Sequence, residues 1–229
     1  PVLFVLFTTL LHGQEIKYPI LKSSASVLMH FIPFGWEIYD LATGDLNDDG
    51  EKDYAVIIQR HDSMRYVADE YFVSSYRDRL LIILLWQAST KNYILAFQNA
   101  EFIPTREGNM LANEPIEKID IQNQQLKISL LHSVHLGSPD NWNHQMVYHF
   151  KMMDDDLKLI NASNSCKMNR YNAYTNYYFD FLKMAVEITK GKTYSKRKKT
   201  TTRKLNSIEI KSIQTLGKAF TWKIDESFL

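Results

Sequence analysis

The residues best suited to chemistry lie in one nine-residue stretch, which reads D-L-N-D-D-G-E-K-D over positions 45–53. Carboxylate or carboxamide side chains occupy loop positions 1, 3, 5 and 9, and Gly50 occupies position 6, where such a loop turns sharply. Short oxygen-bearing side chains at this spacing suit a hard cation. The sequence therefore predicts a structural calcium site with five ligands, of which Glu51 contributes its main-chain carbonyl: Asp45, Asn47, Asp49, Glu51 and Asp53.

The residues that follow the loop decide which kind of calcium site it is. In a helix–loop–helix hand, position 12 carries a bidentate glutamate, whereas here it is Val56, inside an apolar run typical of a strand. We therefore expect a strand–loop–strand site, with weaker affinity than that of a cytosolic sensor. An all-oxygen, flexible ligand set favours calcium over magnesium. The alternative is a solvent-exposed acidic turn without a metal, since Asp, Asn and Gly are common in turns.

Histidine and cysteine offer weaker candidates. Two neighbouring predicted strands each have two histidines on or near them, but alternation points His132 inward and His149 outward, so we do not expect a zinc site there. Cys166 is the single cysteine, which excludes an intrachain disulfide, and we expect it to be a packed residue rather than a nucleophile. The other two histidines are His135, on the first of these strands, and His144, just before the second.

Charge gives little indication of a nucleic-acid partner. The formal net charge is +1 over 229 residues, so no global field attracts a polyanion. The basic stretch 196–204 lacks interleaved aromatic residues. We expect it to be a solvated hairpin tip or loop, and the alternative is a surface for an anionic ligand.

The elements that must position the loop are mainly strands. Apolar runs separated by short turn signals predict a mainly β, antiparallel meander, closed or nearly closed like an open barrel, with one short N-terminal helix over 24–31; α+β is the alternative. Residues 61–79 are expected to be irregular or partly helical, and 101–115 a long connection. The predicted strands are 35–42, 53–59, 80–86, 93–98, 118–122, 126–135, 145–151, 157–163, 177–188 and 205–213.

The first thirteen residues differ from the rest. An uninterrupted apolar run over 2–11 is too short to span a membrane and ends at H-G-Q-E. It is typical of the apolar core and cleavage region of a secretory signal, although a buried first strand is the alternative. We therefore expect residues 1–13 to be a residual signal segment, 14–229 to be a single domain, and the protein to be exported to the periplasm or the extracellular space.

The loop and its flanking strands resemble the calcium loop of FG-GAP/VCBS-type repeats. Three further segments, 31–36, 44–50 and 79–84, resemble an uncharacterised family of exported bacterial proteins that carry a single such loop. The resemblance implies an exported single-domain protein and supplies no activity. We expect a binding or interaction module whose partner is a protein or a glycan, without nucleic acid and without a membrane span. The alternative is an exported hydrolase whose active site the sequence does not reveal.

Overall fold

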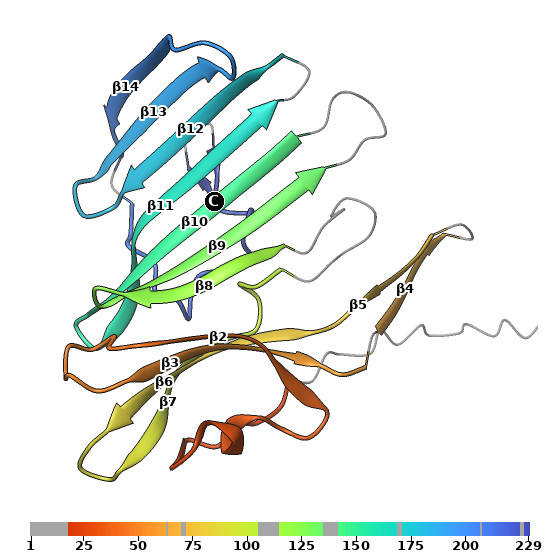
Figure 1. Cartoon of the computed structure of the whole chain (residues 1–229), viewed down its shortest axis with the longest axis vertical. Coiled ribbons are helices and arrows are strands. Elements are labelled where there is room, and N and C mark those ends of the chain that lie inside the picture. Colours follow the sequence, from red (N-terminus) through yellow and green to blue (C-terminus); the bar gives the residue numbers. More distant parts are fainter. Residues whose placement is uncertain are drawn as a thin grey trace, which may run out of the picture.

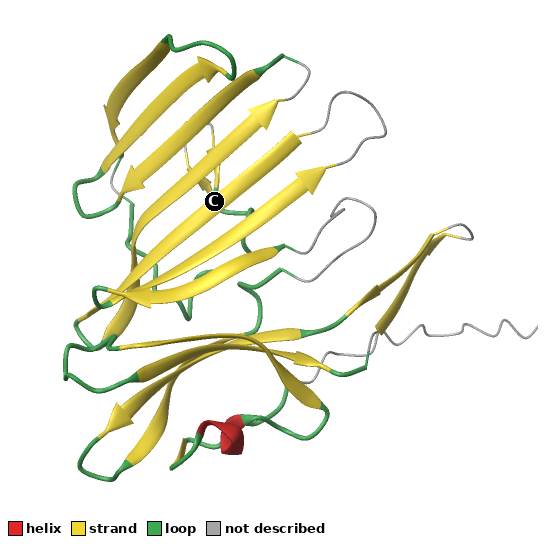
Figure 2. Cartoon of the chain, viewed as in Figure 1, coloured by secondary structure: helices red, strands yellow, loops and turns green. Residues whose placement is uncertain are grey.

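The computed structural model is mainly β (Figures 1 and 2). It describes residues 18–62, 64–69, 72–104, 115–134, 142–168, 171–206, 208–224 and 227–229. The proposed signal segment, 1–13, lies outside this part. No helix among the described residues has the length and apolarity needed to cross a membrane.

Five antiparallel strands form the sheet that carries the metal loop. Their order is β1-β7-β6-β3-β2, with β3 and β6 at the centre. The centre is apolar on both faces, since Val56, Ile57, Leu81 and Ile82 are all buried. The uninterrupted apolar runs in the sequence of these two strands predict such burial. The strands are β1 (Ser24–Ala25), β2 (Trp36–Gly44), β3 (Asp53–Arg60), β6 (Arg79–Gln87) and β7 (Asn92–Asn99).

Seven antiparallel strands form the second sheet, and they follow one another in sequence order from β8 to β14. This confirms the predicted meander. The strands are β8 (Ile116–Gln122), β9 (Gln125–Val134), β10 (Trp142–Met153), β11 (Asp156–Met168), β12 (Ala173–Asp180), β13 (Ala185–Lys192) and β14 (Lys198–Lys204).

The two sheets share one hydrophobic core but do not close into a barrel (Figure 1). Ile57 and Ile83 from the first sheet pack in the same buried cluster as Tyr148 and Phe150 from the second. The sheets meet where β2 approaches β8. A Cβ atom built on Gly44 would lie 2.6 Å from Cγ2 of Ile121, so only glycine allows this approach without a shift.

Residues 205–229 run behind the seven-stranded sheet and cover its inner face (Figure 1). The strand expected over 205–213 is wrong: among the described residues of 205–213, only Ser212 is paired, through an isolated bridge to Lys158. Its apolar residues Ile213 and Leu216 are buried in the shared core instead. Two short strands, β15 (Lys223–Ile224) and β16 (Ser227–Phe228), end the chain.

Three other expectations need correction. The helix over 24–31 is not confirmed, because Ser24–Ala25 pair with β7 and a single 3₁₀ turn spans Leu28–Phe31. The strand expected over 177–188 is two strands, β12 and β13, joined by a turn in which Lys183 donates to Asp180. The irregular connection expected over 61–79 contains a hairpin that projects from the molecule, β4 (Met64–Asp69) and β5 (Phe72–Tyr76).

Candidate metal site

The acidic loop joins β2 to β3, in the strand–loop–strand arrangement that the sequence predicts. Gly44 and Asp53 are the last Cα pair of the two strands, so residues 45–52 form the connection. The backbone turns at two left-handed positions, Asp48 with φ 63° and Gly50 with φ 82°. Leu46 points into the shared core and is 1 % exposed, which anchors one end of the loop.

Asp45 organises the first half of the loop. Its Oδ1 accepts hydrogen bonds from the N–H groups of Asp48, at 2.8 Å, and Asp49, at 3.3 Å. Its Oδ2 accepts from the N–H of Gly50 at 3.0 Å. A carboxylate oxygen has more than one lone-pair site, so these bonds leave it acceptor capacity for a cation. Position 1 of the loop is thus held in place by the loop's own backbone.

Asn47 and Asp49 form a second pair of oxygen-bearing groups. The Asn47 amide Nδ2 donates to Asp49 Oδ2 at 2.8 Å, and the N–H of Glu51 donates to Asp49 Oδ1 at 2.8 Å. The Asn47 Oδ1 atom is buried without a hydrogen-bond partner. A buried oxygen of this kind is costly unless a donor or cation satisfies it, so the donor set fits an oxygen-seeking metal ion.

Asp53 is the most constrained of the predicted ligands. It is 0 % exposed, and both its oxygens accept backbone hydrogen bonds. Oδ2 accepts from the N–H of Leu46 at 2.8 Å, and Oδ1 from the N–H of Trp86 on β6 at 2.9 Å. Asp53 therefore connects the loop to a central strand of the sheet.

The electrostatics of the loop favour a cation. Residues 45–53 hold five carboxylates and one lysine. Burial raises the pKa of the Asp53 carboxyl above its ordinary value, while its two N–H donors lower it and the charges of Asp49 and Asp45 raise it further. A divalent cation would offset this mutual repulsion.

The same negative charge reaches the neighbouring aromatic residues. Burial and a hydrogen bond to Tyr54 raise the pKa of Tyr93 to about 12, and the charges of Asp53 and Glu51 add to this effect. The Tyr93 ring lies 4.9 Å from the rings of both Tyr54 and Trp86, measured between centroids.

The five predicted ligands are gathered in one loop, but their carboxylates face separate N–H donors. Among the described residues, no group of three or more His, Cys, Asp or Glu side chains is arranged as a metal centre. Glu51 is exposed at position 7. Convergence of all five oxygens on one ion, with small side-chain rotations inside the loop, remains a prediction.

A groove begins beside the loop, which the sequence did not reveal. A cavity of about 320 Å³ is lined by Asn47 and Asp49 together with Trp86 and Gln87. A second cavity, of about 540 Å³, shares two lining residues of β6 and β7 with the first and continues to the β10–β11 turn and the C-terminal segment. The shared residues are Leu85 and Ala96.

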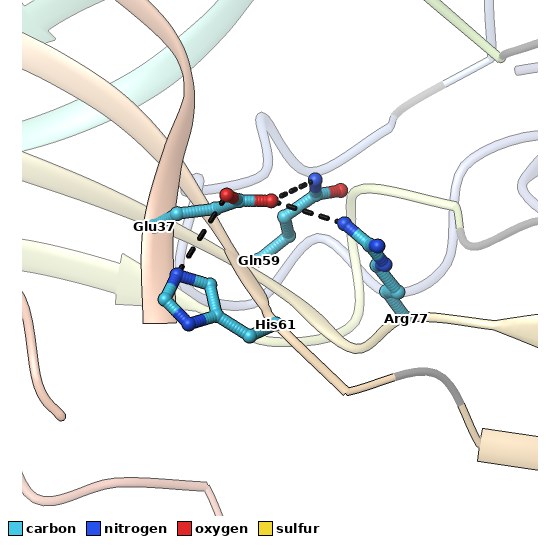
Figure 3. A network of polar contacts seen from close by, with 4 residues as sticks. All are labelled: Glu37, Gln59, His61 and Arg77. Atoms are coloured by element: carbon cyan, nitrogen blue, oxygen red, sulfur yellow. Dashed lines mark hydrogen bonds and ion pairs between the residues drawn. The ribbon is translucent and has the colours of Figure 1, made fainter. Parts of the chain in front are cut away.

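A second polar cluster lies at the other end of β2 and β3 (Figure 3). Glu37 Oε1 accepts from Gln59 Nε2 at 2.8 Å and from Arg77 at 3.0 Å, and its Oε2 lies 3.7 Å from His61 Nε2. The charged side chains are 40 to 56 % exposed. Pairs this exposed contribute about 0–1 kcal/mol each to stability, so this cluster adds only a small amount to the pairing of β2 with β3.

The histidines are divided between the two faces of the second sheet. His149 lies on the face opposite the buried Tyr148 and Phe150, and burial, together with Lys127, lowers its pKa. His135 lies outside the described residues. His144 lies on the inner face and contacts Cys166, a juxtaposition that the sequence analysis missed because 22 residues separate the two.

Comparisons with protein-family models, with curated proteins and with solved structures found no match for this chain.

Proposed function

We propose that this protein is an exported binding module in which one structural calcium ion orders the end of a ligand-binding groove. The observation that carries the proposal is the position of the acidic loop. Asn47 and Asp49, two of the predicted ligands, also line the groove. An ion bound by the loop would therefore fix one wall of the groove.

The loop also links the two sheets, which gives the ion a structural role. Leu46 anchors it in the shared core, and Asp53 ties it to Trp86 of the first sheet. Gln124, in the turn between β8 and β9 of the second sheet, donates to Asp48 Oδ1 at 3.0 Å. A cation that orders residues 45–53 would stabilise these contacts together, because all of them depend on one loop conformation.

The composition of the groove favours a ligand with both polar and apolar surface. Its lining includes the apolar residues Leu85, Ala96 and Met152. Residues with amide, hydroxyl and carboxylate groups also line it, including Gln87, Ser212 and Gln214. Ligand sites in proteins commonly measure about 300–1,000 Å³ and combine an apolar surface with a few polar groups. A glycan or a protein segment has this chemistry.

A glycan microarray probed with the labelled protein, with calcium and with chelator, tests the proposal. We expect binding to a defined glycan class in calcium, reduced by chelator and abolished in Ala96→Trp, which fills the shared part of the groove. Gln98→Trp is the matched control, because Gln98 lies on the same strand and is exposed outside the groove. Binding that Ala96→Trp leaves intact would contradict the assignment of the groove.

A further inference from the structure

The basic stretch forms the outermost strand of the second sheet. The sequence predicts a hairpin tip or loop over 196–204, whereas residues 198–204 form β14, which pairs with β13 along one side. All seven residues of β14 are exposed, and Figure 1 shows the strand at the outer rim of the sheet. Among the described residues, no strand pairs with its other side. Alternate residues of β14 therefore direct N–H and C=O groups to solvent there.

The net charge of +1 conceals a strong separation of charge along the chain. Residues 181–204 hold nine lysine and arginine residues and one carboxylate, Glu187, so this segment carries +8 and the other residues together carry −7. The acidic loop is too distant to neutralise it, because β2 packs against β8, at the opposite edge of the second sheet. Six strand spacings separate β14 from β8, or about 29 Å, whereas the screening length at physiological ionic strength is about 8 Å.

The stability of the sheet does not account for this concentration of positive charge. Lys190 of β13 and Lys199 of β14 are Cα partners, and like charges directly opposite each other destabilise a sheet. The one carboxylate of this segment, Glu187, lies opposite Thr202 rather than opposite a lysine. Lysine on an edge strand deters pairing with neutral or basic strands, but it does not deter pairing with an acidic strand.

The order of charges in β14 selects among possible partner strands. The strand reads K-K-T-T-T-R-K, two basic pairs around three threonines, and this charge pattern is the same from either end. Antiparallel pairing with a second copy, centred on Thr201, would place Lys198 opposite Lys204 and Lys199 opposite Arg203, which makes four like-charge pairs. A strand with acidic pairs at the same spacing would instead place a carboxylate opposite each cation, in either direction.

We propose that the outer edge of β14 binds an extended acidic segment of a partner polypeptide by strand addition. The segment carries two acidic pairs separated by three uncharged residues. Main-chain hydrogen bonds hold it, and the four cations of β14 select its charge. The β-branched residues Thr200–Thr202 favour an extended backbone beneath its centre. This site is separate from the groove and from the acidic loop, so it requires no calcium.

Titration of the full chain with three labelled peptides in chelator, followed by fluorescence anisotropy, tests the proposal. E-E-T-V-T-E-E has the proposed pattern, and K-K-T-V-T-K-K reverses its charge. E-E-P-P-T-E-E keeps the acidic charge, but its adjacent prolines remove one N–H donor from each side of the peptide strand. We expect E-E-T-V-T-E-E to bind, the proline peptide to bind about tenfold more weakly, and the basic peptide not to bind. Equal affinity for the two acidic peptides would show a surface for polyanions and would overturn strand addition, as would no binding of E-E-T-V-T-E-E at millimolar concentration.

Charge reversal within β14 supplies the variant. Lys199→Glu combined with Arg203→Glu should weaken the binding of E-E-T-V-T-E-E by about tenfold or more. Both positions are exposed, and Lys199→Glu places a carboxylate opposite Lys190, so the fold should be retained. Lys127→Glu combined with Lys167→Glu is the matched control, since it makes the same change in net charge at exposed positions of β9 and β11. The control should bind like the wild type; equal loss in both double variants would assign binding to net charge and contradict a site on β14.

Amide hydrogen exchange locates the contact on the chain. At free E-E-T-V-T-E-E ten times its dissociation constant, about one site in eleven is unoccupied, so the outward-facing amides of residues 198–204 should exchange about tenfold more slowly. Added calcium should not change this protection. Bound peptide that leaves these amides unprotected would refute strand addition. Protection that appears in the wild type without peptide, and grows with protein concentration, would show that a second copy covers the edge and would also refute it.

Discussion

Replacing Asp53 by alanine should destabilise the calcium-free protein markedly, since this buried carboxylate accepts two backbone N–H groups. The variant leaves the N–H of Leu46 buried without a partner and the N–H of Trp86 partly buried without one. A buried donor left unsatisfied costs about 1–3 kcal/mol. The cost of burying the charge, which also raises the pKa of Asp53, offsets part of this contribution. We therefore expect the free energy of unfolding to fall by about 3 kcal/mol.

Urea denaturation in chelator measures this change, followed by far-UV circular dichroism. Asp62→Ala is the matched control, because Asp62 is an exposed acidic residue outside the loop. It should alter the free energy of unfolding by no more than about 0.5 kcal/mol. If Asp53→Ala were as stable as this control, the hydrogen bonds of Asp53 would not hold the loop to β6, and the reasoning from them would fail.

Three further predictions concern the loop and its surroundings. At free calcium about 100 times the dissociation constant, the protein should gain about 2.7 kcal/mol, so calorimetry should show a Tm several degrees lower in chelator without loss of the β-rich far-UV spectrum. The raised folded-state pKa of Asp53 means that protonation of this carboxyl adds stability to the calcium-free protein. This proton-linked part, which is separate from the two N–H hydrogen bonds, is fully present below the unfolded pKa and is lost as pH rises through the folded pKa; calcium affinity, measured by titration at several pH values, should rise over the same window. Gly44→Val should destabilise by about 1–3 kcal/mol in urea, because its side chain would meet Ile121, whereas Gly217→Ala, where a Cβ meets nothing within 4 Å, should not.

The local features of the fold could be predicted from the sequence because they depend on neighbouring residues. Spacing alone located the loop, and the apolar runs on either side located the strands that hold it. The alternation of apolar and polar residues over 205–213 correctly indicates that some of them are buried, but it does not show strand pairing. A segment that lies across a sheet buries its apolar residues as a paired strand does. The turn after Asp180 was missed because Leu182 and Met184 make it as apolar as a strand.

The features that needed long-range register could not be predicted. The groove depends on how the β6–β7 hairpin meets the β10–β11 turn, and these lie some sixty residues apart in the chain. The contact between His144 and Cys166 depends on the pairing of β10 with β11, whose register shifts between His149 and Phe150. A one-residue difference in such a register moves a side chain to the opposite face.

Isothermal titration of the chelator-stripped protein with calcium tests the central claim most directly. We predict one binding event per chain with a dissociation constant between micromolar and millimolar, and its loss in Asp49→Ala, which removes the acceptor that Asn47 and Glu51 share. A wild-type titration without heat at millimolar calcium, together with a Tm that chelator leaves unchanged, would show that residues 45–53 form an acidic turn and bind no ion.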